Sequence, residues 1–274
     1  MNDRQLLNGR SIAPKKSLGQ NFLHDPHTLE KIVALAELPP GATVLEIGPG
    51  TGNLTRALAR AAARVIAVEV DDRLIPLLQA IFTDQPHVEI VHGDILTLDL
   101  AGRLGGMPYI LVANLPYYIT SAILRHVFEG MPRPQRIVVT VQREVAERLV
   151  AAPGDMSLLA VSVQFYGQPR IALRLSAGAF WPRPDVDSAV VRIDVYERPP
   201  VDVPDEALFF RVVRAGFGQK RKQLRNAISA GLGLDKAAAD ALLRAAGIDP
   251  QRRAETLSLE EWAALARAVA GMPG

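Results

Sequence analysis

The segment Thr43-Val-Leu-Glu-Ile-Gly-Pro-Gly-Thr-Gly52 joins a short apolar run to a glycine-rich turn. Its first part, Thr43–Ile47, has the composition of a buried strand, and the amphipathic stretch 54–62 after the turn predicts a helix. Glycines between a strand and a helix permit a tight turn and let the backbone approach a ligand closely. The segment therefore predicts the first unit of an α/β domain, with a ligand lying against the turn.

Short apolar runs continue to alternate with amphipathic stretches along the first two-thirds of the chain. Further strands are predicted at Arg64–Glu69, Val88–His92, 109–113 and Arg136–Gln142, with helices at 73–82, 121–129 and 143–150. Two more β-like runs, 160–166 and 189–195, have no clear helix between them. This spacing predicts a doubly wound α/β fold, with a parallel sheet covered on both faces and an antiparallel pair at its end.

The pattern changes at the proline-rich stretch 197–204, which is typical of a linker. Helical spacing then recurs at 205–215, 220–230, 236–246 and 259–269, and glycines separate these stretches. We therefore expect two domains. Residues 1–200 form a catalytic domain with an N-terminal arm at 1–24, and residues 201–274 form a small all-helical domain.

Composition excludes several classes of protein. The 274 residues contain no cysteine, which excludes disulfide scaffolds, thiol catalysis, iron–sulfur clusters and thiolate zinc sites. His24 and His27 have no third ligand nearby, so no metal site is expected. The sequence has no apolar run near the roughly 20 residues of a membrane span and no secretory signal at its start, so we expect a cytoplasmic protein without a membrane partner.

The net charge of +2 conceals a local basic run. Six basic residues and no acid lie between positions 211 and 225: Arg211, Arg214, Lys220, Arg221, Lys222 and Arg225. Such a run is either a solvated helix face or a patch that contacts phosphates. The rest of the sequence has to decide between the two.

Acidic and amide side chains follow the predicted strands at the edge where a doubly wound sheet binds its ligand. Glu69 ends the second strand, 19 residues after Gly50, where an acid binds ribose hydroxyls. Asp94 follows the third strand and Asn114 the fourth. Together with Glu46, these acids favour a cationic, phosphate-free ligand such as S-adenosylmethionine over a dinucleotide.

Asn114-Leu-Pro-Tyr117 is suited to methylation of an exocyclic adenine amine. The Asn114 carboxamide oxygen and the Leu115 carbonyl can accept the two amine hydrogens, which favours a pyramidal nitrogen with an available lone pair. Pro116 stiffens the turn, and Tyr117 offers a face on which a base can stack. Positioning therefore accounts for most of the expected catalysis, and no strong general base is needed.

These motifs occur in an order that resembles the ribosomal RNA adenine N6,N6-dimethyltransferases, specifically the KsgA type that acts on small-subunit rRNA. The resemblance runs from about Lys15 to the end of the chain. It rests on Lys15-Lys-Ser-Leu-Gly-Gln-Asn-Phe-Leu23, Glu46-Ile-Gly-Pro-Gly-Thr-Gly-Asn53, Glu69, Gly93-Asp94, Asn114-Leu-Pro-Tyr117, Phe180-Trp-Pro-Arg-Pro184 and Gly216-Phe-Gly-Gln-Lys-Arg-Lys-Gln-Leu-Arg-Asn226. It implies a Rossmann-like class I methyltransferase sheet followed by a helical C-terminal domain. One departure is Tyr118, where many relatives have Asn after the tyrosine of the motif.

The resemblance also implies roles for individual residues. Cofactor contacts would come from Gln20, Asn21, Phe22, Leu23, Gly48, Gly50, Glu69, Asp94 and Asn114, with Glu69 on the ribose and Asp94 on the cofactor's adenine amine. Asn114 and Leu115 would hold the target amine, Pro116 would shape the turn, and Tyr117 and Phe180 would stack on the target base. The basic run at 211–225, together with Lys15 and Lys16, would contact rRNA phosphates.

The implied reaction is dimethylation of two adjacent adenines near the 3′ end of 16S rRNA during 30S assembly, by a protein that we expect to be monomeric. One alternative is an Erm-type enzyme that methylates 23S rRNA and confers macrolide resistance. Another is a non-catalytic rRNA-binding assembly factor that retains the fold. A nicotinamide-dependent dehydrogenase is a more distant alternative, which a cofactor titration would distinguish.

Overall fold

The computed structural model describes residue 7 and residues 12–130, 132–219 and 221–272. The chain divides into two compact units. The first, called here the sheet unit, comprises Met1–Ala146 and Gln168–Val195, and the second, the helical unit, comprises Glu147–Gly167 and Tyr196–Gly274. The division differs from the sequence-based boundary at residue 200, because Glu147–Gly167 groups with the C-terminal helices.

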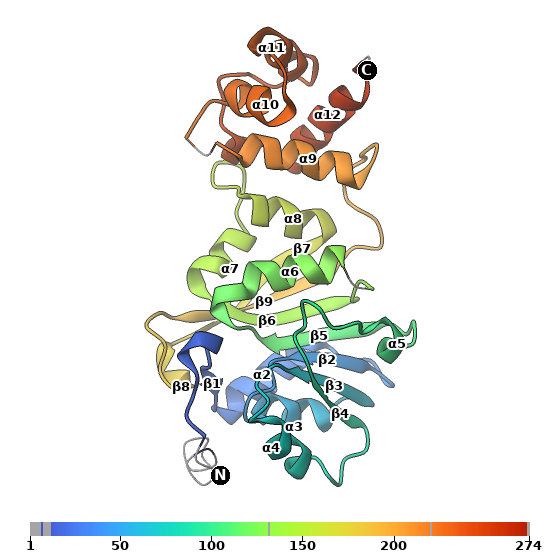
Figure 1. The fold of residues 1–274 in the computed structure, drawn as a ribbon, viewed down its shortest axis with the longest axis vertical. Helices are drawn as coiled ribbons and strands as arrows, with labels where there is room; N and C mark the ends of the chain where they lie inside the picture. Colours follow the sequence, from blue (N-terminus) through green and yellow to red (C-terminus); the bar gives the residue numbers. More distant parts are fainter. Residues whose placement is uncertain (1–6, 8–11, 131, 220, 273–274) are drawn as a thin grey trace. The chain divides into compact units, whose positions relative to one another are not determined.

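The sheet unit is built on seven strands that lie side by side in Figure 1. Their order is β4 (Val88–His92), β3 (Arg64–Glu69), β2 (Thr43–Ile47), β5 (Tyr109–Asn114), β6 (Arg136–Gln142), β9 (Ser188–Val195) and β7 (Gly167–Leu175). Strands β2 to β6 pair in parallel, and β9 pairs with β6 in antiparallel orientation. The predicted α/β class and its parallel strands are confirmed.

The strand order reverses direction at β2, which places a ligand crevice at that point of the sheet. Strand β2 pairs with β3 on one side and with β5 on the other. The chain therefore builds one half of the sheet outward through β4 and then crosses to begin the other half at β5. The loops after β2 and β5 diverge from this switch point, which is where open α/β sheets bind ligands.

Helices bury the apolar face of the sheet. Helix α2 (Pro26–Ala36) packs against β5, β6 and β9, α3 (Asn53–Ala59) against β3, and α4 (Ile75–Ile81) against β4. Leu29, Leu58, Leu78 and Val112 belong to the resulting core and are all buried. The remaining connections of this unit carry α5 (Ala101–Leu104), α6 (Thr120–Glu129) and the start of α7 (Arg143–Leu149). Among the described residues, no helix is long and apolar enough to cross a membrane.

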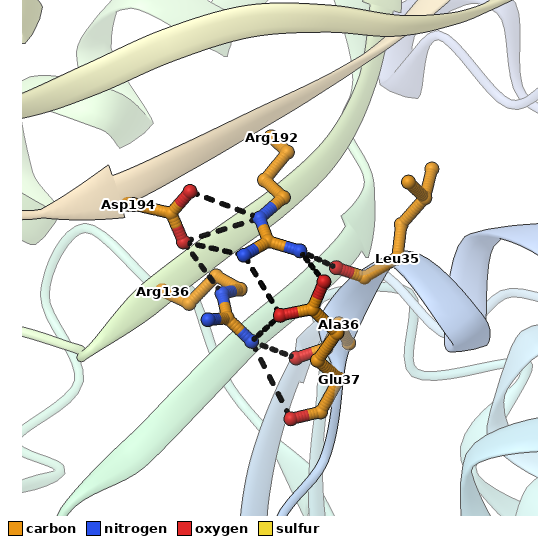
Figure 2. Close-up of polar contacts among 6 residues, drawn as sticks. All are labelled: Leu35, Ala36, Glu37, Arg136, Arg192 and Asp194. Atoms are coloured by element: carbon orange, nitrogen blue, oxygen red, sulfur yellow. Dashed lines mark hydrogen bonds and ion pairs between the residues drawn. The ribbon is translucent and has the colours of Figure 1, made fainter.

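Two arginines fasten the end of α2 to strands β6 and β9 (Figure 2). The guanidinium of Arg192, whose side chain is 7% exposed, donates to the Leu35 carbonyl and to the carboxylates of Glu37 and Asp194. Arg136 donates to the Ala36 carbonyl at 2.7 Å and to Asp194 at 2.7 Å. The two cations thus satisfy carbonyls left unpaired at the helix C-terminus and neutralise both acids. This network fixes α2, the helix that directly follows the N-terminal arm.

A two-stranded sheet holds the arm, and it was not predicted. Strand β1 (Phe22–Leu23) pairs in antiparallel orientation with β8 (Phe180–Trp181), so that Phe22 lies opposite Trp181 and Leu23 opposite Phe180. The rings of Phe22 and Trp181 are stacked at a centroid distance of 6.3 Å. Two residues per strand are too few for any periodicity, which explains why the sequence pattern did not reveal this pairing.

The helical unit contains α8 (Leu158–Tyr166), α9 (Glu206–Phe217), α10 (Leu224–Leu232), α11 (Lys236–Ala245) and α12 (Leu259–Ala270) (Figure 1). The strand predicted at 160–166 is wrong, because these residues form most of α8. Ser157 caps this helix by accepting from the Ala160 amide. Phe165 stacks on Phe209 of α9 at 4.6 Å, so the apolar side chains of α8 are buried by tertiary partners. The alternation of Ser162 and Gln164 with apolar residues favours a strand, and tertiary packing overrides this local pattern.

Two further boundaries differ from the sequence-based expectation. Helix α10 begins at Leu224 rather than at residue 220, so the centre of the basic run lies in the turn before the helix. Gly216 and Gly231, predicted to separate helices, lie inside α9 and α10. A Cβ atom on Gly231 would lie 2.5 Å from the Cβ of Ala215, so this glycine permits α9 and α10 to approach closely.

Candidate functional site

A pocket of about 730 Å³ opens at the carboxyl ends of the parallel strands β2 to β5. The loop after β2, Glu69 at the end of β3, Asp94 after β4 and the Asn114–Tyr118 segment after β5 all line it, together with residues 18–22 of the N-terminal arm. The structure thus brings together most of the site residues expected from the sequence. These are Gln20, Asn21, Phe22, Gly48, Gly50, Glu69, Asp94, Asn114, Leu115, Pro116 and Tyr117.

The turn after β2 depends on glycine at each of its three glycine positions. Gly48, Gly50 and Gly52 have φ angles of 70°, 58° and 81°, in the left-handed region that side chains rarely adopt. A Cβ atom on Gly50 would also lie 2.8 Å from the ring of Phe22. A side chain at position 50 would therefore collide with the arm, and glycine lets the backbone of the turn form part of the pocket wall.

Glu69 closes the adjacent wall and is held in a fixed orientation. Its carboxylate is 4% exposed and accepts from the amides of Gly50 at 3.0 Å and Asp71 at 2.8 Å, one on each oxygen. Burial raises the pKa of Glu69, whereas these two amide hydrogen bonds lower it. Each carboxylate oxygen has two lone-pair sites, so the group can also accept a pair of hydroxyls such as those of a ribose.

Asn114 is oriented by the N-terminal arm. Its Nδ2 donates to the carbonyl of Asn21 at 2.8 Å across 93 residues of sequence. None of the described residues donates to Oδ1, so the oxygen end of the amide remains able to accept from a ligand. The next residue, Leu115, is anchored by its amide, which donates to the Thr140 carbonyl at 3.1 Å.

The two tyrosines of this segment differ in exposure. Tyr117 lines the pocket, and its hydroxyl is 2.6 Å from Ser188 Oγ, a hydrogen bond that anchors the hydroxyl end of the ring. Burial raises the pKa of Tyr117, so its phenol stays neutral. Tyr118 also lines the pocket but is 57% exposed, and a Cβ atom on Gly19 would lie 3.2 Å from its ring. Tyr118 therefore forms part of the pocket mouth.

Two other expected residues lie outside the main pocket. Phe180 is 3% exposed and packs in the core behind β1, so its ring offers no face to a base and the expected stacking has no support in this geometry. Leu23 is equally buried, and it lines a smaller adjoining pocket of about 320 Å³. Its carbonyl accepts from Asn53 Nδ2 at 3.1 Å, a contact that ties the arm to the start of α3.

The expected phosphate-binding residues are placed very differently from one another. Lys15 pairs with Asp71 at 3.3 Å, and Arg225 pairs with Asp240 at 3.6 Å. Arg211 and Arg214 are exposed on α9 and line an open groove between α9 and α10. Arg221 and Lys222 are exposed in the turn before α10. Lys220 and the side chain of Lys16 lie outside the described residues.

The sequence analysis missed several residues of the site. Asp71 and Arg73 hold the arm, Ser188 holds Tyr117, and Leu18 and Gly19 line the pocket. The Asp71-Asp-Arg73 string directly after a strand end was a usable signal for the first pair. Ser188 gave no signal, because its contact spans 71 residues of sequence.

The electrostatic character of the main pocket agrees with a cation. Its described lining contains the carboxylates of Glu69 and Asp94 and no lysine or arginine. A pyrophosphate requires cations or several free amides, whereas a positively charged ligand is favoured by this lining. Among the described residues, no group of three or more His, Asp or Glu side chains could hold a metal ion.

Glu46, two residues before the first glycine of the turn, is a buried carboxyl whose pKa is raised. It is 1% exposed, its Oε2 has no partner among the described residues, and burial raises its pKa from 4.5 to about 8. Between these two values, the unfolded chain releases the proton while the folded protein retains it. The free energy of unfolding therefore falls as pH rises through this range, by up to roughly 5 kcal/mol.

Replacing Glu46 by Gln should remove this pH dependence, because the amide has the same shape and does not titrate. We expect Glu46→Gln to be more stable than the parent protein at about pH 8, and the difference to shrink toward about pH 5. Urea denaturation at several pH values measures it. Glu144→Gln, at an exposed glutamate on α7, is the matched control and should follow the parent. Parallel pH profiles for Glu46→Gln and the parent would contradict the protonated state.

Comparisons with known proteins identify the family of the chain. Residues 13–270 match the family described as ribosomal RNA adenine dimethylase. A protein of Dehalococcoides mccartyi named ribosomal RNA small subunit methyltransferase A is 48% identical over 271 residues, which cover 98% of this chain and 93% of that relative. A protein of the same name from Moorella thermoacetica is 45% identical, covering 96% of this chain and 94% of the relative.

Two solved structures share the fold over most of the chain. A dimethyladenosine transferase from Plasmodium falciparum superposes with a TM-score of 0.73 at 25% identity, covering 89% of this chain and 95% of that one. The 23S rRNA methyltransferase ErmE superposes with a TM-score of 0.72 at 28% identity, covering 91% and 100%. These neighbours confirm the class I methyltransferase fold, and the chain belongs to the ribosomal RNA adenine dimethylase family.

Proposed function

We propose that this protein uses S-adenosylmethionine to dimethylate the N6 amines of two adjacent adenines near the 3′ end of small-subunit rRNA, during assembly of the 30S subunit in the cytoplasm. The observation that carries the proposal is the Asn114 amide at the end of β5, with its oxygen free to accept and two carboxylates across the same pocket. The choice of small-subunit rRNA is supported by relatives of that name, which are 45–48% identical, whereas ErmE is 28% identical.

The pocket residues fit S-adenosylmethionine in charge and in hydrogen-bonding capacity. Glu69 can accept the two ribose hydroxyls, and Asp94 can accept the adenine amine through the oxygen that does not bind the Leu96 amide. Gly48, Gln20 and Asn21 line the same pocket and would hold the methionine end. When bound, this cofactor supplies a methyl group on a sulfonium, which departs as a neutral thioether once the methyl is transferred.

The chain's own residues prepare the amine for attack. Asn114 Oδ1 and the Leu115 carbonyl accept the two hydrogens, so the nitrogen lone pair is directed at the methyl carbon. The ring of Tyr117, whose hydroxyl end is anchored by Ser188, stacks on the target adenine. The Tyr117 phenol stays neutral and therefore cannot act as a base, so the proton lost from nitrogen passes to solvent. Holding the reactants in line supplies most of the rate enhancement.

We assign the sequence-independent phosphate contacts with rRNA to the exposed cations of the helical unit. Arg211 and Arg214 on α9, and Arg221 and Lys222 in the turn before α10, are exposed. Phosphate contacts of this kind position an RNA without reading its sequence. Lys15 and Arg225 are less suitable, because each already pairs with an acid.

Methylation of purified ribosomal subunits tests the function. We expect the protein to transfer labelled methyl groups to 30S particles that lack the modification, and adenine analysis of the 3′ end to show N6,N6-dimethyladenine. Label in 23S rRNA alone would establish the Erm-type alternative. Binding to 30S particles without any transfer would establish the non-catalytic assembly factor.

Binding of charge-reversal variants to 30S particles tests the proposed rRNA contacts. Arg211→Glu with Arg214→Glu should weaken 30S binding at least tenfold and reduce its salt dependence, because two phosphate contacts are lost. Lys31→Glu with Arg60→Glu changes the net charge equally at exposed positions of α2 and the end of α3 and should bind normally. If the α9 double variant bound 30S particles as tightly as the control double variant, the α9 arginines would not contact rRNA.

A further inference from the structure

Asp71 is a buried carboxylate that does not line the pocket and yet collects several donors. Its side chain is fully buried, and Gln20 Nε2 donates to Oδ2 at 2.8 Å. Lys15 Nζ lies 3.3 Å from Oδ1, and Arg73 donates to both oxygens at 2.9 and 2.6 Å. These hydrogen bonds, that of Arg73 foremost, hold the pKa of Asp71 well below its usual range. The group is therefore ionised at any pH at which the protein works.

Most of these donors belong to the N-terminal arm or contact it. The Lys15 amide donates to Gln20 Oε1 at 2.7 Å, which closes a small ring of contacts around Asp71. Arg73 reaches further back and donates to the Ala13 carbonyl at 3.1 Å. Segment 13–20 is thus fastened to the loop after β3 through one carboxylate. We call Asp71 with Lys15, Gln20 and Arg73 the arm latch.

The residue immediately after the latch controls the orientation of Asn114. The Asn21 carbonyl accepts from Asn114 Nδ2 at 2.8 Å. If the amide were flipped, Oδ1 would face this carbonyl, and two acceptors in contact repel each other. The Asn21 carbonyl therefore selects the orientation in which Oδ1 stays free for the target amine. On its other side, Asn21 is followed by β1, which is held by β8 and by Asn53.

We propose that Asp71 is a positioning residue for methyl transfer: the arm latch holds Asn21 so that its carbonyl fixes the Asn114 amide with the oxygen toward the substrate. This inference rests on the proposed function. The latch holds the arm before Asn21, and the β1–β8 pair holds it after Asn21. Loss of the latch therefore removes one of the two supports of Asn21. A misplacement of about 1 Å at a reacting group can lower the rate about 100-fold. Loss of one of the two supports of Asn21 should therefore lower the rate of methyl transfer about 10- to 50-fold.

Kinetics of three variants test the latch. Asp71→Asn removes the charge, and Gln20→Leu removes one donor from the arm. Gln20→Glu places a second carboxylate against Asp71 without changing shape. With cofactor saturating, we expect each to lower kcat about 10- to 50-fold and to leave KM for 30S within about threefold. Asp72→Asn removes the same charge from an exposed neighbour and should behave as the parent.

A spectroscopic readout separates positioning from a general structural role. The chain has six asparagines, so the side-chain amide spectrum of [15N]Asn-labelled protein is simple, and the Asn114 signal is identified by its loss in Asn114→Ala. We expect the Asn114 amide protons to shift and to exchange faster in Gln20→Glu and Asp71→Asn. The Gln20 variants alter only the partly buried arm, so they remain informative if Asp71→Asn does not fold.

The outcomes are distinguishable. Unchanged kcat at saturating cofactor, or an unchanged Asn114 signal in both folded Gln20 variants, would overturn the latch. Parent protein that transfers no methyl group would overturn the proposed function, and the amide signal would still decide whether the latch orients Asn114. A lowered kcat together with a shifted Asn114 signal supports both.

Discussion

Asn114→Ala should lower the rate of methyl transfer to 30S particles by about 1,000-fold, because the substitution removes the acceptor that directs the lone pair of the target amine. The substitution also removes the Nδ2 donor to the Asn21 carbonyl. Both losses act at the reacting nitrogen and at the arm beside it. Single-turnover transfer of a labelled methyl group, with cofactor saturating, measures the effect on chemistry alone.

The expected loss is confined to catalysis. Glu69 and Asp94, the main proposed cofactor contacts, keep their backbone partners in the variant. Calorimetric titration should therefore give a cofactor dissociation constant within about tenfold of the parent value. Asn114→Asp is the informative companion, since it retains an acceptor oxygen and sets a carboxylate against the Asn21 carbonyl. It should be slower than the parent and faster than Asn114→Ala. Full activity in Asn114→Ala would refute the assignment of the target amine to Asn114.

The parts of the site that could be predicted from sequence are those fixed by the ends of parallel strands. Glu69 and Asn114 end strands with a clear apolar pattern and Asp94 follows another, and parallel strands bring their carboxyl ends to one edge. The left-handed glycines of the first turn follow from the same pattern. No tertiary information was needed to expect a ligand at this edge.

Contacts between distant segments could not be predicted from sequence. The Asn21–Asn114 hydrogen bond spans 93 residues, and the Gln20–Asp71 hydrogen bond spans 51. Each depends on where the arm is folded, which a two-residue strand does not reveal. The pairing of Lys15 with Asp71 changes that lysine from an expected phosphate contact into part of the arm latch.

The helical unit shows a different limit of sequence patterns. Residues 161–165 alternate between apolar and polar side chains, with Ser162 and Gln164 at the polar positions, which is the two-residue period of a strand. They nevertheless form most of α8, which packs against α9 and α12. Gly216 was expected between helices, since glycine is a poor helix former. Its position inside α9 is explained only by the indole of Trp262, which comes from a segment 46 residues later in the sequence.

Gly216→Ala should destabilise the protein by about 2–4 kcal/mol, although alanine in a helix is normally better than glycine by about 1 kcal/mol. A Cβ atom at this position would lie 2.3 Å from Cη2 and 2.9 Å from Cζ3 of Trp262, and 3.4 Å from Cδ1 of Leu224. Trp262 is fully buried on α12, so its ring cannot move away into solvent. Helices α9 and α12 must therefore separate, or the indole must leave its preferred rotamer.

Chemical denaturation compares this variant with a matched glycine. Gly102→Ala places the same methyl group in α5, where no atom lies within 4 Å of the new Cβ. It should be neutral or stabilising by up to about 1 kcal/mol. All residues that line the main pocket, the proposed cofactor site, belong to the sheet unit, so folded Gly216→Ala should bind the cofactor as the parent does. Its defect should appear only as a lower midpoint of unfolding.

A double-mutant cycle identifies the indole as the cause. Trp262→Phe removes the two ring atoms that a Cβ on Gly216 would overlap, and alone it leaves a cavity that costs about 2–4 kcal/mol. In the double variant, the new methyl group occupies part of that cavity. The combined loss should therefore be smaller than the sum of the single losses by about 1–3 kcal/mol. Strictly additive losses would mean that Gly216 is required for another reason, such as the approach of Leu224. A coupling of the expected size would show that α9 requires glycine at position 216 because the indole of Trp262 on α12 occupies the space of a Cβ atom.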